Sequence, residues 1–151
     1  MRIRSEIVGC GSYLPERVVT NAELSAKIDT TDEWITSRTG IRERRYVEPG
    51  TGASVHGALA ARKALEVAEV DPSDVDLIIC ATVSPDYIIP STAALIQREL
   101  GCKRAGGFDL SGACCGYVYA VDTAARFVAT GAARNALVVG SEVMTAVSDP
   151  T

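Results

Sequence analysis

The chain has 151 residues, enough for one ordinary domain with a substantial core. Its composition, 47% hydrophobic and 23% charged, is that of a globular protein, and its net charge of −4 argues against a nucleic-acid binder. No apolar run approaches the ~20 residues of a membrane helix, and no secretory signal opens the chain, so we expect a cytoplasmic protein without membrane association. Arginines cluster at Arg42, Arg44 and Arg45, either as a solvated face or as a contact for a phosphate-bearing partner.

The first fifty residues predict short elements separated by turns. Asn21 can cap one helix, and Thr30 and Glu33 have the spacing of a capping box for a second helix. A Gly/Pro turn, GSYLPE, follows the first strand. The expected elements, in chain order, are a strand over Ile3–Cys10, a helix over Ala22–Ile28, a helix over Asp32–Arg38 and a strand over Ile41–Val47.

The remaining hundred residues alternate between helical and strand patterns. Apolar residues at helical spacing predict the helices, and the almost wholly apolar run VDLIICATV predicts a strand that is covered on both faces. The expected elements are a helix over Ser54–Val70, a strand over Val75–Val83, a helix over Thr92–Leu100, a strand ending at Leu110, a helix over Cys115–Thr130 and a strand over Ala136–Ser141. Strand–helix alternation at these intervals predicts parallel pairing, hence a layered α/β/α domain with a βαβαβ order.

The five cysteines could form disulfides, bind a metal or provide a reactive thiol. Their number is odd and no CxxC spacing occurs, which argues against a disulfide framework or a metal site and favours buried thiols with one reactive thiol among them. They are Cys10, Cys80, Cys102, Cys114 and Cys115.

Two of these cysteines lie in the segment FDLSGACCGYVYAVDTAARF, where small residues join a buried strand to a long helix. A thiol at a helix N-terminus is favoured as the thiolate, and free N–H groups there can stabilise an oxyanion on an attacked carbonyl. Cysteine here suits acyl transfer. From the residues alone, a buried structural cysteine pair remains the alternative.

The runs GSYLPE, TTDEWITSRTGIRERR, FDLSGACCGY, ALVVGSE and SDPT, in this order and spacing, resemble the β-ketoacyl-acyl carrier protein synthase III family of the thiolase superfamily. The resemblance covers the whole chain and implies the N-terminal half of a thiolase-like fold. The family's nucleophile lies six residues after the Phe of the FD pair, which implies Cys114 as the nucleophile, whereas Cys115 takes a position that is usually a small residue.

The resemblance implies a two-step reaction. An acyl group passes from acyl-coenzyme A, a substrate and not a resident cofactor, to Cys114, and malonyl-acyl carrier protein then condenses with it to a 3-oxoacyl product. A helical insertion over about residues 21–47 would bind coenzyme A. Trp34 and Arg38 match the family's coenzyme A pair, through stacking on adenine and contact with the base or phosphates. Thr30 is a weaker candidate in that cleft, with a simple helix cap as its alternative.

The same resemblance implies assembly. The run SPDYIIPST is similar to a loop that crosses the family's dimer interface, which places Ile89 at the end of the partner's acyl pocket and implies a homodimer. The family's catalytic His and Asn lie in the C-terminal half of the fold, which this chain does not contain. We expect His56, the one histidine, to be an ordinary helix residue. The C-terminal half, on the same polypeptide or a second chain, should carry the catalytic His and Asn.

Alternatives remain. The alternative within the superfamily is a specialised ketosynthase or acyltransferase of secondary metabolism, which this half of the chain leaves open. Hydroxymethylglutaryl-coenzyme A synthases keep a Glu where this chain has Val83, which counts against them. A non-enzymatic alternative is an inactive half-subunit that serves assembly alone.

Overall fold

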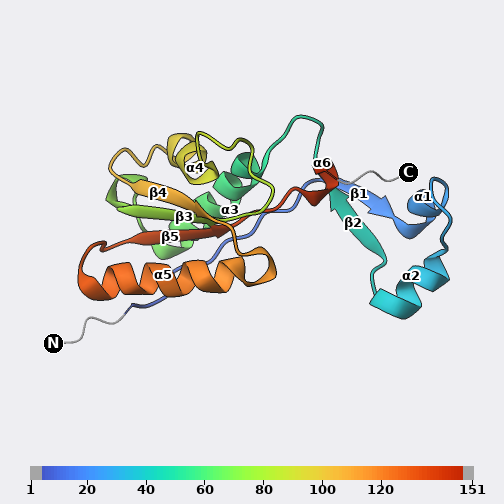
Figure 1. Ribbon diagram of the computed structural model, residues 1–151, viewed down its shortest axis with the longest axis horizontal. Coiled ribbons are helices and arrows are strands. Elements are labelled where there is room, and N and C mark those ends of the chain that lie inside the picture. The colour runs from blue at the N-terminus through green and yellow to red at the C-terminus, as the bar shows by residue number, and fades with distance from the viewer. Residues whose placement is uncertain (1–4, 148–151) are drawn as a thin grey trace. The chain divides into compact units, whose positions relative to one another are not determined.

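The structure, a computed structural model, describes residues 5–147 (Figure 1). It contains two compact units. The large unit comprises residues 5–13 and 52–142 of the described chain, and the small unit comprises residues 14–51 and 143–147. The SDPT motif at residues 148–151 lies outside the described residues.

A three-stranded parallel sheet forms the centre of the large unit. Its order is β4 (Gly106–Leu110), β3 (Leu77–Ala81) and β5 (Ala136–Gly140), with β3 paired in parallel to both neighbours. Every residue of β3 is buried, which confirms the prediction of a strand covered on both faces. The predicted strand ran two residues further at each end, beyond the paired part.

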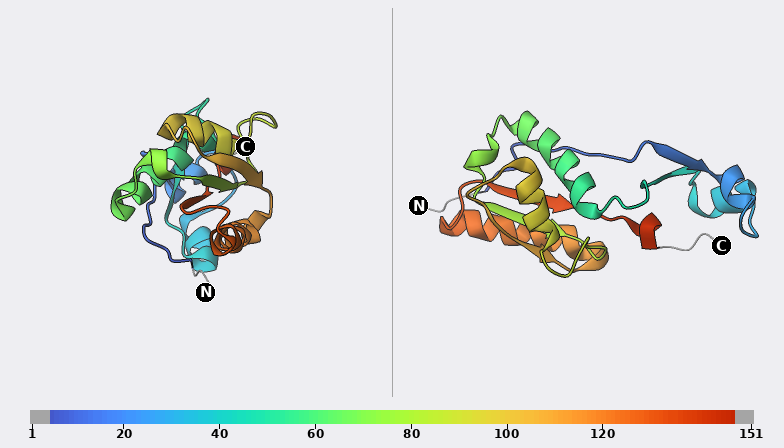
Figure 2. Two further views of the ribbon diagram at one scale, coloured as in Figure 1. Left: turned by 90° about the vertical axis from the view of Figure 1, so that its left-hand side faces the viewer. Right: turned by 90° about the horizontal axis from the view of Figure 1, so that it is seen from above.

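Helices cover both faces of this sheet. α3 (Ala53–Ala68) and α4 (Thr92–Leu100) pack on one face, and α5 (Gly116–Thr130) packs on the other, as Figures 1 and 2 show. Side chains of β3 alternate between the faces, so that Ile78 joins the α3/α4 cluster and Ile79 joins the α5 cluster. The predicted layered α/β/α arrangement is confirmed.

The three long helices closely follow their predicted ranges. α4 has the predicted bounds, with Ser91 as its N-cap and Gly101 in a left-handed C-cap. α3 ends two residues early, because Glu69 turns into the left-handed region and Val70 N–H bonds back to the Leu65 carbonyl. α5 begins at Gly116, one residue later than predicted, because Cys115 belongs to a preceding 3₁₀ turn.

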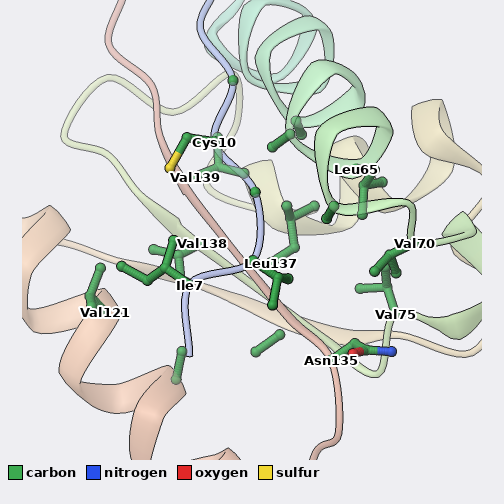
Figure 3. A pocket seen from close by; sticks show the side chains of 18 of the residues that line it. Ile7, Cys10, Leu65, Val70, Val75, Val121, Asn135, Leu137, Val138 and Val139 are labelled. Carbon is green, nitrogen blue, oxygen red and sulfur yellow. The ribbon is translucent and has the colours of Figure 1, made fainter. Parts of the chain in front are cut away.

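The predicted strand over Ile3–Cys10 is wrong within the described residues. Residues 5–11 form no strand; Gly9 and Gly11 instead lie so close to α3 that a Cβ on either would approach a helix carbonyl oxygen to 2.4 Å. A cavity of about 880 Å³ lies between this segment, α3, α5 and β5, with Ile7, Cys10 and Val138 among its lining residues (Figure 3). The segment and β5 both line this cavity, and within the described residues the segment pairs with no strand.

The small unit contains an antiparallel pair that the sequence predicted only in part. β1 (Arg17–Thr20), which was not predicted, pairs with β2 (Glu43–Tyr46), which lies inside the predicted strand over Ile41–Val47. The helices are α1 (Asn21–Ser25), shorter than predicted, α2 (Asp32–Thr39), and α6 (Met144–Val147), which was not predicted.

The helix caps of the small unit were each predicted one residue away from their observed positions. Thr20 Oγ1 accepts the Glu23 N–H at 3.2 Å, and Thr31 Oγ1 accepts the Trp34 N–H at 3.1 Å, so these threonines cap α1 and α2. Both have extended backbone, which directs the hydroxyl toward the first turn. Asn21 and Thr30 are therefore not caps.

Asn21 is instead the buried centre of the small unit. Its Nδ2 donates to Asp32 Oδ1 at 2.7 Å and to the Ile41 carbonyl at 2.8 Å, and its Oδ1 accepts from Arg44 Nη2 at 2.7 Å. The side chain thus joins α1 to α2 and to both ends of the Ile41–Arg44 segment. No helix in the described part of the chain is long and apolar enough to cross a membrane.

Candidate active site

The turn between β4 and α5 presents the cysteines that the sequence singled out. A 3₁₀ turn over Ala113–Cys115 follows Ser111 and Gly112, and Cys115 N–H bonds to the Gly112 carbonyl at 3.1 Å. Ala113 has a φ of 45°, an uncommon left-handed conformation for a residue with a side chain. Cys114 lies at the middle of this constrained turn, at the N-terminal end of α5.

Small residues around the turn are required by close packing. A Cβ on Gly112 would lie 2.8 Å from Gly116 Cα, and one on Gly140 would lie 3.1 Å from a ring carbon of Tyr117. The glycines therefore allow the Cys114 turn and the first turn of α5 to pack closely against each other and against the end of β5. This explains why the predicted nucleophile is surrounded by small residues.

Exposure separates the five cysteines into two kinds. All are free thiols: Cys80 and Cys102 are buried, whereas Cys10, Cys114 and Cys115 are exposed. Burial raises the pKa of Cys80 to about 12, with Asp109, Glu142 and Asp86 adding to the effect, and burial also raises the pKa of Cys102. The structural alternative for the pair in the turn, two buried thiols, is thus excluded, while Cys114 and Cys115 are not distinguished by exposure.

The predicted coenzyme A residues lie in the small unit. Trp34 is 54% exposed on α2, and the Arg38 guanidinium lies 5.0 Å from the centroid of its indole ring. One helical turn separates them, which brings a flat aromatic surface and a cation together at the surface. Thr30 Oγ1 is buried and has no hydrogen-bond partner, so its alternative role as a helix cap is excluded.

The arginine cluster is largely committed to the small unit itself. Arg44 donates to Asn21 and to the Val19 carbonyl, and Arg45 donates to the carbonyls of Pro15 and Glu16. These bonds join the chain segments on either side of the β1–β2 pair. Arg44 and Arg45 therefore belong neither to a simple solvated face nor to a free phosphate-binding site, the two alternatives that the sequence left open.

The loop before α4 ends in an apolar tip on the large unit. Tyr87, Ile88 and Ile89 are 61%, 94% and 87% exposed, so packing of this tip on its own domain is excluded. The tip precedes the Ile89–Pro90 bond and the Ser91 cap of α4. An exposed group of large apolar side chains is typical of a contact surface.

His56 packs as a residue of α3. Its ring stacks on Tyr13 with centroids 5.4 Å apart, and within the described residues neither ring nitrogen has a hydrogen-bond partner. Burial lowers the pKa of His56, an effect partly opposed by the carboxylate of Asp86. The imidazole is thus held as a neutral packing group. Among residues 5–147 no group of three or more His, Cys, Asp or Glu side chains could hold a metal ion.

Sequence reasoning missed three carboxylates at the edge of the sheet where the strands end. Asp109, directly before the last residue of β4, accepts the N–H groups of Thr92 and Ala93 at the start of α4, at 2.7 and 2.8 Å. Asp86, on the loop after β3, accepts the Ser54 N–H at the start of α3. Glu142, two residues after β5, accepts the Val83 N–H on that same loop. The signal that could have found them is an acidic residue at or just after the end of a predicted strand, where free N–H groups gather.

The large unit is a layered α/β/α unit with an exposed cysteine in a strand-to-helix turn, and the solved structures that it matches show it to be the N-terminal half of a thiolase-like fold. The family model for 3-oxoacyl-[acyl-carrier-protein] synthase III matches residues 108–151, which include the turn with Cys114. A β-ketoacyl-[acyl-carrier-protein] synthase III of Desulfitobacterium hafniense (strain Y51) is 51% identical over 138 residues, 91% of this chain and 42% of that protein.

The comparison with solved structures leads to the same family of proteins. The crystal structure of 3-oxoacyl-[acyl-carrier-protein] synthase III from Aquifex aeolicus VF5 matches with a TM-score of 0.92 and 44% identity, over 96% of this chain and 47% of that one. The priming β-ketosynthase from the R1128 polyketide biosynthetic pathway matches with a TM-score of 0.95 and 46% identity, over 99% and 45%. The chain belongs to the β-ketoacyl-acyl carrier protein synthase III family and spans about half the length of the curated relatives it matches.

Proposed function

We propose that the complete protein is a condensing acyltransferase that initiates fatty acid synthesis. The Cys114 thiolate takes an acyl group from acyl-coenzyme A, forming a thioester as the coenzyme A thiol leaves. Malonyl-acyl carrier protein then loses CO₂, and its carbanion forms a carbon–carbon bond to the thioester carbonyl as the bond to Cys114 breaks. The observation that carries this proposal is the exposed Cys114 in a constrained turn at the N-terminus of a 15-residue helix.

Binding of coenzyme A is assigned to the helical insertion over about residues 21–47. The exposed indole of Trp34 offers a stacking surface for adenine, and the Arg38 guanidinium beside it offers charge for the base or phosphates. The buried, unpartnered hydroxyl of Thr30 is a third candidate on this insertion. Acyl-coenzyme A is thus a substrate in this proposal, and no permanently bound cofactor is required.

The proposal needs a second half. Within the described residues the one histidine is packed on Tyr13, so a catalytic His and Asn must come from a C-terminal half. The apolar tip around Ile89 supports a homodimer in which this residue closes the partner's acyl pocket. We place the enzyme in the cytoplasm, where acyl-coenzyme A and acyl carrier protein are available.

A specialised ketosynthase of secondary metabolism is the second candidate. It is favoured by the similarity to the priming β-ketosynthase of the R1128 pathway. Both candidates use Cys114 and differ in the carrier protein and starter group that they accept. An inactive half-subunit, the third possibility, would form no acyl-enzyme at all.

Acyl-enzyme formation tests the proposal directly. The complete polypeptide is incubated with acetyl-coenzyme A or a longer acyl-coenzyme A, and its intact mass is measured. We expect one acyl group on the peptide that contains Cys114, none in Cys114→Ala, and most of the wild-type yield in Cys115→Ala. Acylation of Cys114→Ala but not of Cys115→Ala would show that the nucleophile is Cys115, and absence of acylation in the wild type would leave the inactive half-subunit.

A further inference from the structure

A closed set of hydrogen bonds surrounds the carboxyl ends of β3 and β5. Ser141, directly after β5, donates its N–H to the Ala81 carbonyl at 3.2 Å and its hydroxyl to the Ala53 carbonyl at 2.7 Å. The residue is buried. Ser141 thus joins the end of β5 both to the end of β3 and to the first turn of α3.

Glu142, the next residue, binds the loop that leaves β3. Its carboxylate accepts from Val83 N–H at 2.8 Å and from Ser84 Oγ at 2.5 Å, and lies 3.5 Å from Thr82 Oγ1. Thr82 and Ser84 are buried, whereas Val83 and Glu142 are exposed, so the carboxylate binds the loop from its solvent side, and an ionised acceptor strengthens each bond. One carboxylate therefore holds three consecutive loop residues.

Asp86 fixes the same loop at a second point. Its carboxylate accepts from the Ser54 N–H at 2.8 Å and from Ser54 Oγ at 3.0 Å, at the start of α3. The carboxylate also lies against Gly52, where a Cβ would come within 1.7 Å of Asp86 Oδ1. Glycine at position 52 is therefore required for this contact.

These two anchors end where the apolar tip begins. Residues 82–86 are held between the end of β5 and the start of α3, whereas the next three residues, Tyr87–Ile89, project into solvent. The base of the loop is also tied to the strand that leads to the nucleophile, because Thr82 N–H donates to the Leu110 carbonyl at 3.2 Å. The position of the tip on the large unit thus depends on the two carboxylates.

We infer that Glu142 and Asp86 are positioning residues that hold the apolar tip Tyr87–Ile89 in place and thereby set the acyl-chain selectivity of the enzyme. The inference rests on the proposed function, in which the tip closes the acyl pocket of the partner subunit in the homodimer. A hydrophobic pocket discriminates by how closely its wall meets the chain, and one methylene changes kcat/KM by roughly 10–200-fold. Displacing the wall therefore changes which chain length is accepted.

Asp76 provides a matched control at the opposite edge of the sheet. Its carboxylate accepts the N–H groups of Arg134 and Asn135 at 2.8 and 3.1 Å, directly before β3 and β5. Those two bonds lower the pKa of Asp76, because they stabilise its ionised form. Asp76→Asn removes the same kind of capping interaction without touching the loop or the tip.

The experiment uses the complete enzyme with Glu142→Gln, Asp86→Asn, Gly52→Ala and Asp76→Asn. For each variant, kcat and KM are measured with a series of acyl-coenzyme A substrates of increasing chain length, together with Tm and the rate of Cys114 alkylation by iodoacetamide. We expect the ratio of kcat/KM between short and long chains to change by about tenfold in the first three variants, with little change in alkylation. Asp76→Asn should keep the wild-type ratio even if its Tm falls equally.

The possible failures are distinguishable. An unchanged chain-length ratio in Glu142→Gln and Asp86→Asn, in folded enzymes that form the acyl-enzyme, would overturn the positioning role alone. The same would follow if Asp76→Asn changed the ratio as much, because the effect would then reflect stability. A wild-type enzyme that forms no acyl-enzyme would instead overturn the proposed function, and the selectivity role with it.

Discussion

In the large unit, apolar clusters on both faces of a parallel sheet form the core, whereas in the small unit a buried asparagine and its polar partners take a central place. Burial of Ile78 and Ile79 is non-directional and tolerates small changes in geometry. The bonds of Asn21 are directional, and each partner lost leaves a buried polar group unsatisfied. The two units should therefore respond differently to substitution, and the proposed chemistry divides between them.

The largest expected effect concerns both units together. Residues 1–151, purified alone, should show no detectable condensing activity, because they contain the proposed nucleophile and coenzyme A residues but no histidine placed as a general acid or base. Activity should return when a C-terminal half is added in trans or fused, measured as 3-oxoacyl product. Full activity of the isolated chain would contradict the proposed need for a C-terminal half.

In the large unit, truncation of the core should be the most destabilising change. Ile78 is fully buried in the α3/α4 cluster, so Ile78→Ala should lower the free energy of unfolding by about 2–5 kcal/mol, the range for large-to-small core substitutions. Denaturant titration measures this. Val67→Ala, at an exposed position of α3, is the control and should have an effect within about 0.5 kcal/mol.

In the small unit, Asn21→Ala should cost about 1–3 kcal/mol, the penalty for leaving buried partners unsatisfied. Because Asn21 joins α1 to α2, the same variant should raise KM for acyl-coenzyme A while alkylation of Cys114 stays unchanged. Ser37→Ala, which removes an exposed hydroxyl from α2, is the control. A loss of Cys114 alkylation in Asn21→Ala would break the proposed division between the units.

Trp34→Ala should act on binding more than on stability. Its indole is more than half exposed, and losing aromatic stacking on a base should weaken acyl-coenzyme A use by about 1–3 kcal/mol, with a smaller effect on KM for malonyl-acyl carrier protein. Trp34→Phe should recover part of the loss by keeping a stacking surface. An unchanged KM for acyl-coenzyme A would remove Trp34 from the proposed site.

A further expected effect is a pH dependence of the stability of the large unit at alkaline pH. Because the pKa of Cys80 is raised to about 12, the folded state keeps a thiol proton that the unfolded chain releases at an ordinary thiol pKa of about 8.5. Stability should therefore fall as the pH rises from about 9 toward 12, and this fall should be shallower in Cys80→Ala. Urea midpoints across that range measure the difference, with Cys10→Ala, at an exposed thiol, as the control. Equal slopes in wild type and Cys80→Ala would contradict it.

The spacing of apolar residues and the turns rich in small residues were enough to predict most of the large unit from the sequence. α4 has its predicted bounds, β3 is buried on both faces as its apolar run indicates, and Cys114 lies in the predicted strand-to-helix turn. These features depend on neighbours within a few residues along the chain, so the local pattern contains the information. The family resemblance, which the comparisons confirm, rests on the same local runs.

Only the tertiary structure decided the features that depend on distant partners. Residues 5–11 contain the apolar pattern of a strand, but a strand also needs a paired neighbour, and this segment pairs with none of the described strands. Asn21 looks like a cap in the sequence, yet its partners Ile41 and Arg44 lie 20 and 23 residues away. Glu142 reaches a loop about 60 residues earlier because parallel pairing of β3 and β5 brings their carboxyl ends together. Such long-range hydrogen bonds have no period in the sequence, so the folded chain alone shows which polar side chains meet.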